Sequence, residues 1–468
     1  MDKHSLDYFF SPHSIAVVGA SNNPDTPSFN LLYNLVNLGF RGKIYAVNPN
    51  VAEIMGVRTY SSLAKIEGNV DLVISAVSAQ RTLDLIDQYV HKNVRAVVIV
   101  SGGFSEIGAH GLQMQDEMAR QFKDHSIRVI GPNTLSPLCF DTNLVISFCK
   151  IRRMRQGSVS MIFQSGMYDP RLNWLYDDFH LGINKLLDLG NKMDIDETDA
   201  LEYLAADSST KIIGIHTEGI KCEGRRFFEV LRATTKKKPV ILLKGGRSVA
   251  GARAAASHTG SIIQEDDFVF DGMLKQAGVI RAKYLEDLFD FAKAFEYIGI
   301  LPAGLGKRCA VASFSGGEGV LTTDICNDEG FALAVPQKQT VDKLSVLFPP
   351  WGITANPIDL GICYQFFGHR DFFKTYLRNM ARDPNTDCML IQFPDVEMLF
   401  NQKDVHKPFL AFKERGKPLV TWAATQDHDM DQPVALLESY RIPVYSSARS
   451  AVKSLSAIYR YTEMNSIA

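Results

Sequence analysis

Short apolar runs separated by amphipathic stretches dominate the first third of the chain. Five such runs follow one another: Ile15–Gly19, Lys43–Val47, Asp71–Val77, Ala96–Val100 and Arg128–Ile130. Runs that are apolar throughout, instead of at every second position, are typical of strands with both faces covered by helices. The pattern therefore predicts an α/β domain with a doubly wound parallel sheet.

The same pattern then occurs twice more. A second series consists of Ser158–Phe163, Asn184–Leu189, Lys211–His216 and Val240–Lys244, and a third of Cys309–Phe314, Asp387–Gln392, Leu419–Trp422 and Ile442–Tyr445. A linker rich in glycine and proline, Leu301–Gly306, lies between the last two series. We therefore expect three consecutive doubly wound α/β domains, with boundaries at 1–138, 139–300 and 301–468.

Loops with small residues follow the strands of the first series. Gly19-Ala20-Ser21 follows the first strand, where doubly wound folds place a ligand at a helix N-terminus. The G-x-G-x-x-G fingerprint is absent, so the loop favours a phosphate-bearing adenine ligand without favouring NAD; the alternative is a purely structural turn. Loops at 75–78, 101–106 and 131–134 would lie at the same sheet edge and could turn N–H groups toward the same ligand.

A segment of small residues, 245–261, follows the last strand of the second series and contains His258. Glycine and alanine let a backbone move and approach a ligand closely. We interpret His258 as a nucleophile that carries a phosphoryl group on this loop; the alternative is an ordinary surface or core histidine. Glu218 follows another buried strand and could orient the imidazole, or could be only a helix N-terminal charge.

Two further turns have the composition of phosphate cradles. Gln164-Ser165-Gly166 follows the strand Ser158–Phe163, and Ser315-Gly316-Gly317 precedes a helix predicted at Val320–Cys326. Their N–H groups, and the positive ends of the helices that follow, could converge on one phosphate at His258. The alternative for the first turn is a simple connection between a strand and a helix.

Composition narrows the class of protein. Apolar residues make up 46% of the 468 residues and charged residues 22%, as in ordinary globular proteins, and the net charge of −2 predicts neither nucleic acid nor membrane partners. The 7 cysteines show no CxxC spacing, so we expect neither a metal site nor a disulfide framework. No signal-peptide pattern or membrane-spanning run is evident, and we expect a cytoplasmic protein.

Several of these motifs occur together in one known family. Lys244–Ser248 and Gly251–Ser261 resemble the phosphohistidine segment of NDP-forming acyl-CoA synthetases. Further motifs match that family in the same order: Ser14–Ser21, Gly102-Gly103-Phe104, Gly131-Pro132-Asn133, Gln164-Ser165-Gly166 and Leu189–Lys192. The chain most resembles the α subunit of ADP-forming acetyl-CoA synthetase and, more distantly, succinyl-CoA synthetase.

The resemblance implies a Rossmann-like CoA-binding domain followed by two flavodoxin-like domains. It implies that acyl-CoA and phosphate form an acyl phosphate, that His258 accepts the phosphoryl group while Glu218 holds the imidazole, and that ADP receives it. Phosphate would be held at Gln164, Ser165, Gly166, Ser315, Gly316 and Gly317. CoA would bind at Gly19, Ala20, Ser21, Asn48, Ser75, Ala76, Val77, Ser101, Gly102, Gly103, Phe104, Gly131, Pro132 and Asn133.

The resemblance also implies a partner and leaves alternatives open. The chain shows no ATP-grasp domain, so we expect a separate β subunit that binds ATP or ADP with Mg²⁺, in an α2β2 complex. Met167–Arg171 and Asn23–Phe29 depart from the family pattern, and Tyr168 and Arg171 are expected to change the shape and charge around the acyl phosphate. A non-catalytic CoA- or nucleotide-binding regulatory homologue is therefore the alternative function; a redox-sensing repressor and an NAD dehydrogenase are less favoured.

Overall fold

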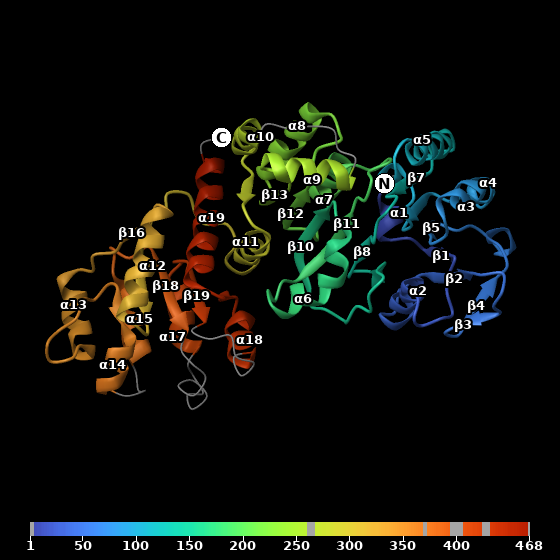
Figure 1. Cartoon of the computed structure of the whole chain (residues 1–468). Helices are drawn as coiled ribbons and strands as arrows, with labels where there is room; N and C mark the ends of the chain where they lie inside the picture. The colour runs from blue at the N-terminus through green and yellow to red at the C-terminus, as the bar shows by residue number, and fades with distance from the viewer. Residues whose placement is uncertain (1–3, 260–266, 368–371, 394–405, 424–430, 467–468) are drawn as a thin grey trace. The chain divides into compact units, whose positions relative to one another are not determined.

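The three series of apolar runs form three sheets in this structure, a computed structural model that describes residues 4–259, 267–367, 372–393, 406–423 and 431–466 (Figure 1). The chain divides into two compact units, residues 1–289 and 290–468, and each is described by itself. The prediction of an α/β fold with three consecutive doubly wound domains is confirmed. The domain boundaries 1–138, 139–300 and 301–468 stay predictions.

The first sheet has the strand order β3-β4-β2-β1-β5-β6-β7 and is parallel except at the β3–β4 pair. Its strands are β1 Ser14–Val18, β2 Lys43–Val47, β3 Glu53–Ile54, β4 Val57–Tyr60, β5 Leu72–Ser75, β6 Ala96–Ile99 and β7 Arg128–Ile130. The accompanying helices are α1 Asp7–Phe10, α2 Pro27–Asn37, η1 Leu63–Lys65, α3 Ala79–Asp84, α4 Ile86–His91, η2 Ser105–Ile107 and α5 Ala109–Asp124.

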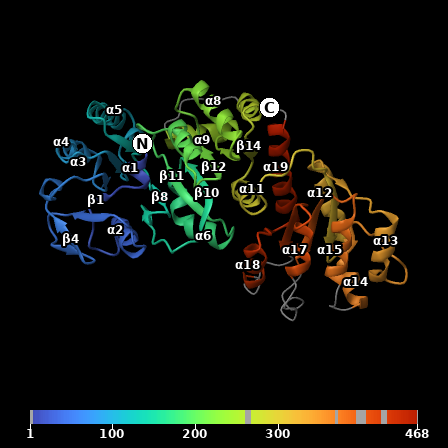
Figure 2. The ribbon, with the colours of Figure 1, turned by 180° about the vertical axis from the view of Figure 1, so that it is seen from behind.

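Alternate residues of β1 face different helices, which explains its unbroken apolar run. Ile15 and Val17 pack in the same core as residues of α2. Ala16 and Val18 pack on the opposite face with Tyr89 of α4 and other residues of α4 and α5. Seen from behind, α2 and α5 lie on opposite sides of β1 (Figure 2). A strand enclosed in this way can be apolar at every position, as the sequence predicts.

The second sheet has the order β14-β13-β12-β10-β11-β8-β9, with the last two strands antiparallel. Its strands are β8 Leu138–Cys139, β9 Leu144–Val145, β10 Gln156–Phe163, β11 Ile183–Asp188, β12 Ile212–Thr217, β13 Val240–Lys244 and β14 Ile280–Ala282. The helices are η3 Gly166–Arg171, α6 Leu172–Asp177, α7 Glu197–Ala206, α8 Gly224–Thr235, α9 Val249–Thr259, α10 Asp267–Gln276 and α11 Leu285–Ile298. One continuous hydrophobic core includes residues of both the first and second sheets, which accounts for the single unit 1–289.

The second unit contains the third sheet, with the order β16-β15-β18-β19-β20 and β17 also paired to β15. Its strands are β15 Arg308–Ser313, β16 Ala332–Leu333, β17 Ile358–Asp359, β18 Cys388–Phe393, β19 Leu419–Ala423 and β20 Val444–Tyr445. The helices are α12 Gly316–Asp328, α13 Lys338–Leu344, η4 Ser345–Leu347, α14 Leu360–Phe367, α15 Phe372–Arg382, α17 His406–Lys413, α18 Asp431–Ser439 and α19 Ala448–Ser466. Among the helices in the described ranges, none combines the length and the hydropathy that crossing a bilayer requires.

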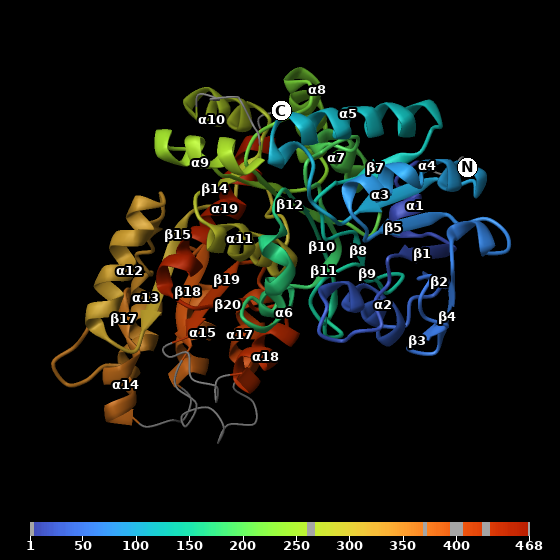
Figure 3. The same ribbon diagram turned by 45° about the vertical axis from the view of Figure 1, so that its right-hand side comes forward.

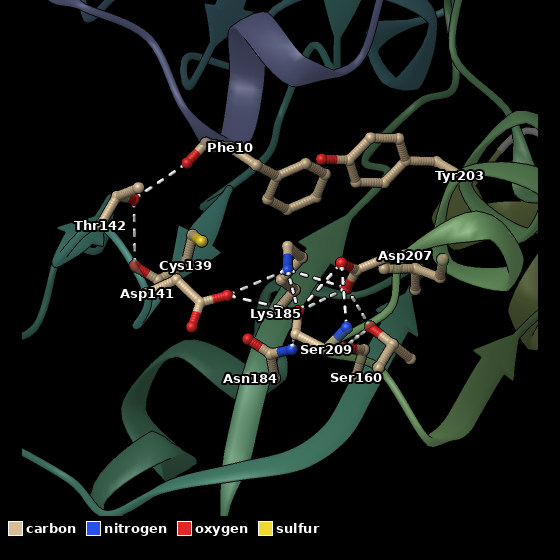
Figure 4. Close-up of polar contacts among 12 residues, drawn as sticks. Phe10, Cys139, Asp141, Thr142, Ser160, Asn184, Lys185, Tyr203, Asp207 and Ser209 are labelled. Atoms are coloured by element: carbon tan, nitrogen blue, oxygen red, sulfur yellow. Dashed lines mark hydrogen bonds and ion pairs between the residues drawn. The ribbon is translucent and has the colours of Figure 1, made fainter. Parts of the chain in front are cut away.

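A buried lysine ties together the amino ends of the strands in the second sheet (Figure 4). The Nζ of Lys185, on β11, donates to Asp207 at 2.8 Å, to Ser209 Oγ at 2.9 Å and to Asp141 at 3.3 Å. Burial opposes charge on Asp207, but hydrogen bonds from Lys185, Thr210 and Ser209 and the charge of Lys185 together outweigh it and lower the pKa of Asp207 to about 2. The pair is therefore ionised at neutral pH.

The same close-up shows how the amino-terminal helix joins the second sheet (Figure 4). The Phe10 ring stacks on Tyr203 of α7 with centroids 5.0 Å apart, and Thr142 Oγ1 donates to the Phe10 carbonyl oxygen at 2.9 Å. Tyr203 also donates its hydroxyl to Asp7 at 3.0 Å. These contacts fix the first domain against the second at the end of the sheet remote from the predicted chemistry.

Candidate active site

Gln164, at the carboxyl end of β10, is held in one orientation. Its Oε1 accepts hydrogen bonds from Lys192 Nζ at 2.6 Å, Thr217 Oγ1 at 2.9 Å and the backbone N–H of Glu218 at 2.9 Å. Because an amide oxygen accepts hydrogen bonds and an amide nitrogen donates them, three donors identify this atom as the oxygen. The amide nitrogen therefore points away from these donors and is the end that can donate to a bound oxyanion.

Lys192, which donates to Gln164, is itself held in place by buried partners. Its Nζ also donates to the Gly219 carbonyl oxygen at 2.8 Å and forms an ion pair with Glu197. Lys192 and Glu197 are 4% and 0% exposed, so the two charges neutralise each other inside the protein. The lysine follows the left-handed turn after β11 (φ +54° at both Gly190 and Lys192), which directs its side chain under the ends of β10 and β12.

Glu218 lies at the carboxyl end of β12, next to the strand that leads to α9. A Cβ atom on Gly245 would lie 3.4 Å from Glu218 Cγ, in van der Waals contact, so the start of the 245–261 segment lies directly beside Glu218. The helix α9, Val249–Thr259, then carries His258 in its last turn. The side chain of His258, together with Gly260 and Ser261, lies outside the described residues, and the predicted contact between Glu218 and His258 stays a prediction.

The turn after Gln164 differs from a simple start of an α-helix. Ser165 caps a short 3₁₀ helix, η3, by accepting the Met167 N–H at 3.3 Å, and α6 begins only at Leu172. The ring of Tyr168 is 2% exposed and stacks on Phe163 with centroids 3.5 Å apart. Tyr168 therefore fills space under the turn inside the core, whereas Arg171 is exposed, and the predicted change of shape and charge around the acyl phosphate stays a prediction.

Three loops at the carboxyl ends of β6, β7 and β11 meet beside this turn. The Glu106 carboxylate accepts the Gly103 N–H at 2.6 Å and the Asn191 side-chain amide at 2.6 Å. Burial pushes the pKa of Glu106 up, but these hydrogen bonds and others from its own loop outweigh it, and the pKa is lowered. The Asn191 N–H donates to the Pro132 carbonyl oxygen at 2.9 Å, and the Asn133 N–H to the Ser101 carbonyl oxygen at 3.0 Å, so the loops after β6 and β7 lie together as predicted, and the loop after β11 joins them.

A pocket of about 280 Å³ lies at the carboxyl ends of β1, β2 and β5. It brings together Gly19, Asn48 and Val77 of the predicted CoA residues. Its lining also contains Arg81, Gln88 and Tyr89, which the sequence analysis did not select. The Gln88 Oε1 is buried without a hydrogen-bond partner among the described residues, and Arg81 brings a positive charge to the pocket.

Other predicted CoA residues lie near this pocket without lining it. Ser75 turns its hydroxyl into the core, 2.9 Å from Thr82 Oγ1. Ser21 Oγ accepts the Asn23 N–H at 3.1 Å, and the Ala20 carbonyl accepts the Asn48 side-chain amide at 2.8 Å. Gly19 has φ +87°, and a Cβ there would lie 2.7 Å from the Ala76 carbonyl oxygen, so this turn requires glycine. Its closeness to Ala76 brings the loops after β1 and β5 to one edge.

The predicted turn Ser315-Gly316-Gly317 belongs to the second unit. The helix predicted at Val320–Cys326 begins earlier, at Gly316, so the two glycines form its first turn. Glu318 is held there by Trp422 Nε1 at 2.7 Å and Gln392 Nε2 at 2.8 Å. The predicted convergence of this turn with Gln164–Gly166 at His258 stays a prediction.

One group with the spacing of metal ligands occurs within the described ranges: Asp196, Glu197 and Cys222. Its chemistry does not favour a metal. Asp196 caps α7 by accepting the Thr198 and Asp199 N–H groups, Glu197 is paired with Lys192, and burial raises the pKa of the Cys222 thiol to about 11. A thiol that stays protonated is a poor metal ligand.

Comparisons with known proteins agree with this geometry. A family model for a CoA binding domain matches residues 13–137, and a model for the succinyl-CoA ligase like flavodoxin domain matches residues 156–295. The chain is 33% identical over 460 residues to the acetate–CoA ligase [ADP-forming] II subunit alpha of Pyrococcus furiosus, covering 97% of each chain. The chain belongs to the ADP-forming acetyl-CoA synthetase α-subunit family.

Two further relatives define the extent of the match. The acetate–CoA ligase [ADP-forming] II of Archaeoglobus fulgidus is 34% identical over 457 residues, and the chain spans 97% of its own length but 66% of that protein's. The solved structure of acetyl-coenzyme A synthetase 1 from Ca. Korarchaeum cryptofilum, in complex with phosphate and ADP, superposes with a TM-score of 0.85 at 31% identity. That superposition covers 98% of this chain and 97% of the other.

The sequence analysis assigned no role to three residues that hold the Gln164 side chain in place: Lys192, Thr217 and Glu197. Lys192 belongs to a motif that the sequence analysis matched to the family, yet it received no role. Its signal was a lysine directly after a glycine turn at the end of a buried strand. Thr217 gave no comparable signal, because it contacts Gln164 and Glu197 from 53 and 20 positions away, and Glu197, 5 positions from Lys192, reads as an ordinary charge at a helix start.

Proposed function

We propose that this chain is the α subunit of an NDP-forming acyl-CoA synthetase, which interconverts acyl-CoA, ADP and phosphate with a carboxylic acid, CoA and ATP. The observation that carries the proposal is the cluster at the carboxyl ends of β10 and β12. There Lys192 and Thr217 hold the Gln164 amide, while Glu218 lies against the strand that leads to the helix with His258.

The proposed reaction proceeds through two intermediates, an acyl phosphate and a phosphohistidine at His258. A phosphate oxygen attacks the thioester carbonyl carbon of acyl-CoA, the C–S bond breaks, and CoA leaves as a thiol after taking up a proton. An imidazole nitrogen of His258 then attacks the phosphorus of the acyl phosphate, releasing the carboxylate. Finally a β-phosphate oxygen of ADP attacks the phosphohistidine, forming ATP and restoring the imidazole. Splitting one transfer into such steps is nucleophilic catalysis.

The chain's own residues would position and stabilise these groups. The Gln164 amide nitrogen would donate to a phosphoryl oxygen, because its carbonyl end is occupied by three donors. Glu218 would accept the N–H of the His258 imidazole and stabilise the positive charge that develops when the other nitrogen is phosphorylated. Lys192 acts through Gln164 and is therefore a positioning residue.

CoA would occupy the pocket at the carboxyl ends of β1, β2 and β5. Glycine at position 19 lets the backbone approach a ligand there, and the Arg81 guanidinium supplies a charge for a phosphate of CoA. The match of residues 13–137 to a CoA binding domain supports this assignment. The loops at 101–104 and 131–133 would guide the thiol end toward the Gln164 turn.

The nucleotide would be bound by a partner. The relative from Pyrococcus furiosus is named as a subunit alpha, and we infer that this chain pairs with a β subunit carrying an ATP-grasp domain, in an α2β2 complex. ATP or ADP and Mg²⁺ would bind to that subunit. The carboxylic acid that serves as substrate is not assigned.

Phosphorylation of the chain tests the proposal directly. The full chain, mixed with the candidate β subunit and γ-³²P-labelled ATP, is expected to acquire acid-labile phosphate. His258→Ala should abolish the label and acyl-CoA formation, because the variant lacks the imidazole to which the proposal assigns the phosphoryl group.

A matched control separates a specific role from general damage. His110 lies exposed on α5, and His110→Ala should label and turn over like the unaltered chain. Normal labelling of His258→Ala would refute the proposal. CoA binding without any labelling of the unaltered chain would refute it too, in favour of a non-catalytic regulatory homologue.

A further inference from the structure

A second polar pocket lies at the carboxyl ends of β12, β13 and β14, beside Glu218. It has a volume of about 530 Å³. We call it the β13 pocket; its polar lining consists of His216, Lys244, Arg247, Ser248, Lys283 and Tyr284. The base of α9 borders this pocket, and α10 lies alongside α9 (Figure 3). None of the residues assigned to CoA or phosphate above lines it.

The lining of the β13 pocket is positively charged. It contains three cationic side chains, those of Lys244, Arg247 and Lys283, and none of the described lining residues is acidic. Arg247 Cζ lies 5.9 Å and Lys283 Nζ 5.4 Å from the centroid of the same Tyr284 ring. Two cations gathered over one ring repel each other, so an anion between them would be stabilising.

The backbone adds N–H groups to these charges. Ser248 caps α9 by accepting the Gly251 N–H on its Oγ at 3.0 Å, and the first turn of this 11-residue helix borders the pocket. Gly245 and Gly246 precede it, and Gly246 has φ +66°. A helix start of this kind carries partial positive charge, and glycines leave the backbone open to a ligand.

His216 supplies an independent indication of a ligand. Its side chain is 7% exposed and lines the pocket, yet its Nδ1 is buried without a hydrogen-bond partner among the described residues. A Cβ on Gly245 would lie 3.7 Å from its Nε2, so the imidazole edge faces the glycine turn. Nε2 is therefore the nitrogen that could donate to a group bound in the pocket, and the unpartnered Nδ1 would then be the unprotonated nitrogen of a neutral imidazole.

We propose that the β13 pocket binds a phosphate or diphosphate group, either as an inorganic anion or as part of a nucleotide. Arg247 and Lys283 hold the anion from the solvent side, the first turn of α9 contributes N–H groups, and His216 donates from the floor of the pocket. The bound anion braces the base of α9, whose other end carries His258. The site is separate from the Gln164 turn, and its occupation requires no phosphoryl transfer.

Calorimetric titration of the full chain, without a β subunit and with Mg²⁺ removed by chelation, tests the proposal. Inorganic phosphate, pyrophosphate and ADP are the three probes. Arg247→Gln/Lys283→Gln should weaken the tightest of them at least about tenfold, because the variant loses both side chains that form charged hydrogen bonds with the anion. The control Arg225→Gln/Lys275→Gln removes the same charge from side chains that are 84% and 73% exposed elsewhere, and should change affinity less than about twofold.

A spectroscopic readout locates the anion. The ring resonances of His216, assigned through His216→Gln, should shift when the anion binds the unaltered chain and should not shift in Arg247→Gln/Lys283→Gln. Tighter binding of ADP than of pyrophosphate would identify a nucleotide, with its base on Tyr284. Equal binding of the two would identify a diphosphate, and equal binding of phosphate and pyrophosphate a single phosphate.

Two results would overturn the proposal. One is the absence of binding by any probe at about 10 mM, a concentration well above weak affinities. The other is equal weakening by both double variants, which would mean an adventitious ion attracted by net charge. Because the titration involves no turnover, His258→Ala should bind the anion normally, so the site and the proposed phosphoryl relay can fail independently.

Discussion

Two buried lysines lie near opposite ends of the same strand, β11, and their surroundings differ. Lys185, near the amino end, is paired with Asp207 and Asp141 and also bonds Ser209. Lys192, just beyond the carboxyl end, is paired with Glu197. Its Nζ also donates hydrogen bonds to the Gln164 side chain and to the Gly219 carbonyl oxygen. One lysine joins structural residues; the other orients a side chain that faces the site.

The difference follows from the geometry of parallel sheets. Carboxyl ends of parallel strands open into the loops that bind ligands, whereas their amino ends are closed by connections. Buried polar atoms without partners among the described residues occur at both ends, Glu197 Oε2 and His216 Nδ1 at the carboxyl end and Asn184 Oδ1 at the amino end, but the three acceptors of Lys185 hold no side chain that faces a ligand loop. Burial of a lysine therefore indicates a functional role only when its location and its partners are known.

The largest effect is expected from Lys192→Met. Removing the ammonium leaves Glu197 as an unpaired buried charge, which should lower the free energy of unfolding by about 3–5 kcal/mol. The Gln164 amide would lose its strongest donor, and phosphorylation of His258 should slow about 100-fold, the scale typical of misplaced groups. Urea unfolding and single-turnover labelling measure the two effects.

A second variant separates the effect on stability from the effect on labelling of His258. Lys192→Met/Glu197→Gln removes both charges, so part of the stability should return while labelling stays slow. Recovery of labelling together with stability would show that Lys192 has only a structural role, and the contrast with Lys185 would disappear.

His216 should give the second largest effect, through pH. Burial, with a contribution from the charge of Lys192, lowers the pKa of His216 to about 4 from an ordinary value of 6.5. The stability carried by the neutral imidazole is complete above pH 6.5 and is lost as the pH falls toward 4, amounting to about 3 kcal/mol. In His216→Gln, the unfolding free energy should therefore lose about 3 kcal/mol less between pH 6.5 and pH 4 than in the unaltered chain, measured without phosphate. An equal pH dependence in the two proteins would contradict the lowered pKa of His216.

Lys185→Met should have a smaller effect, confined to stability. One of its partners, Asp141, is 35% exposed and can be solvated when the lysine is lost, so we expect about 1–3 kcal/mol. Labelling of His258 per folded molecule should remain unchanged. A loss of labelling comparable to that of Lys192→Met would remove the distinction between the two ends of the strand.

Glu106→Gln should give the smallest change. The glutamine amide can still accept the Gly103 N–H. Its hydrogen bond with the Asn191 side-chain amide is weaker than the one that the Glu106 carboxylate forms. We expect a loss of about 1 kcal/mol in unfolding free energy at pH 7. Because the pKa of Glu106 is lowered, the difference between variant and unaltered chain should shrink as the pH falls below 4.5; a constant difference would assign the loss to packing.

Much of the fold could be predicted from the sequence because its strands are apolar at every position. Lys43–Val47, Arg128–Ile130 and Val240–Lys244 were predicted with the bounds that β2, β7 and β13 have. The short strands β3, β16 and β17 were missed, since two-residue strands carry no periodicity. The helix start at Gly316 was missed because two glycines suggest a loop, although glycine is tolerated in a first turn.

The sequence by itself determined which loops follow the strands, and therefore which small-residue turns lie at the carboxyl ends of the three sheets. Only the tertiary structure decided which side chains turn toward those ends. Ser75 proved to point into the core, Tyr168 to lie under its turn, and Lys192 to support Gln164. These outcomes depend on hydrogen bonds and packing between residues distant in the chain, whereas the order of strands and loops depends on local apolar patterns.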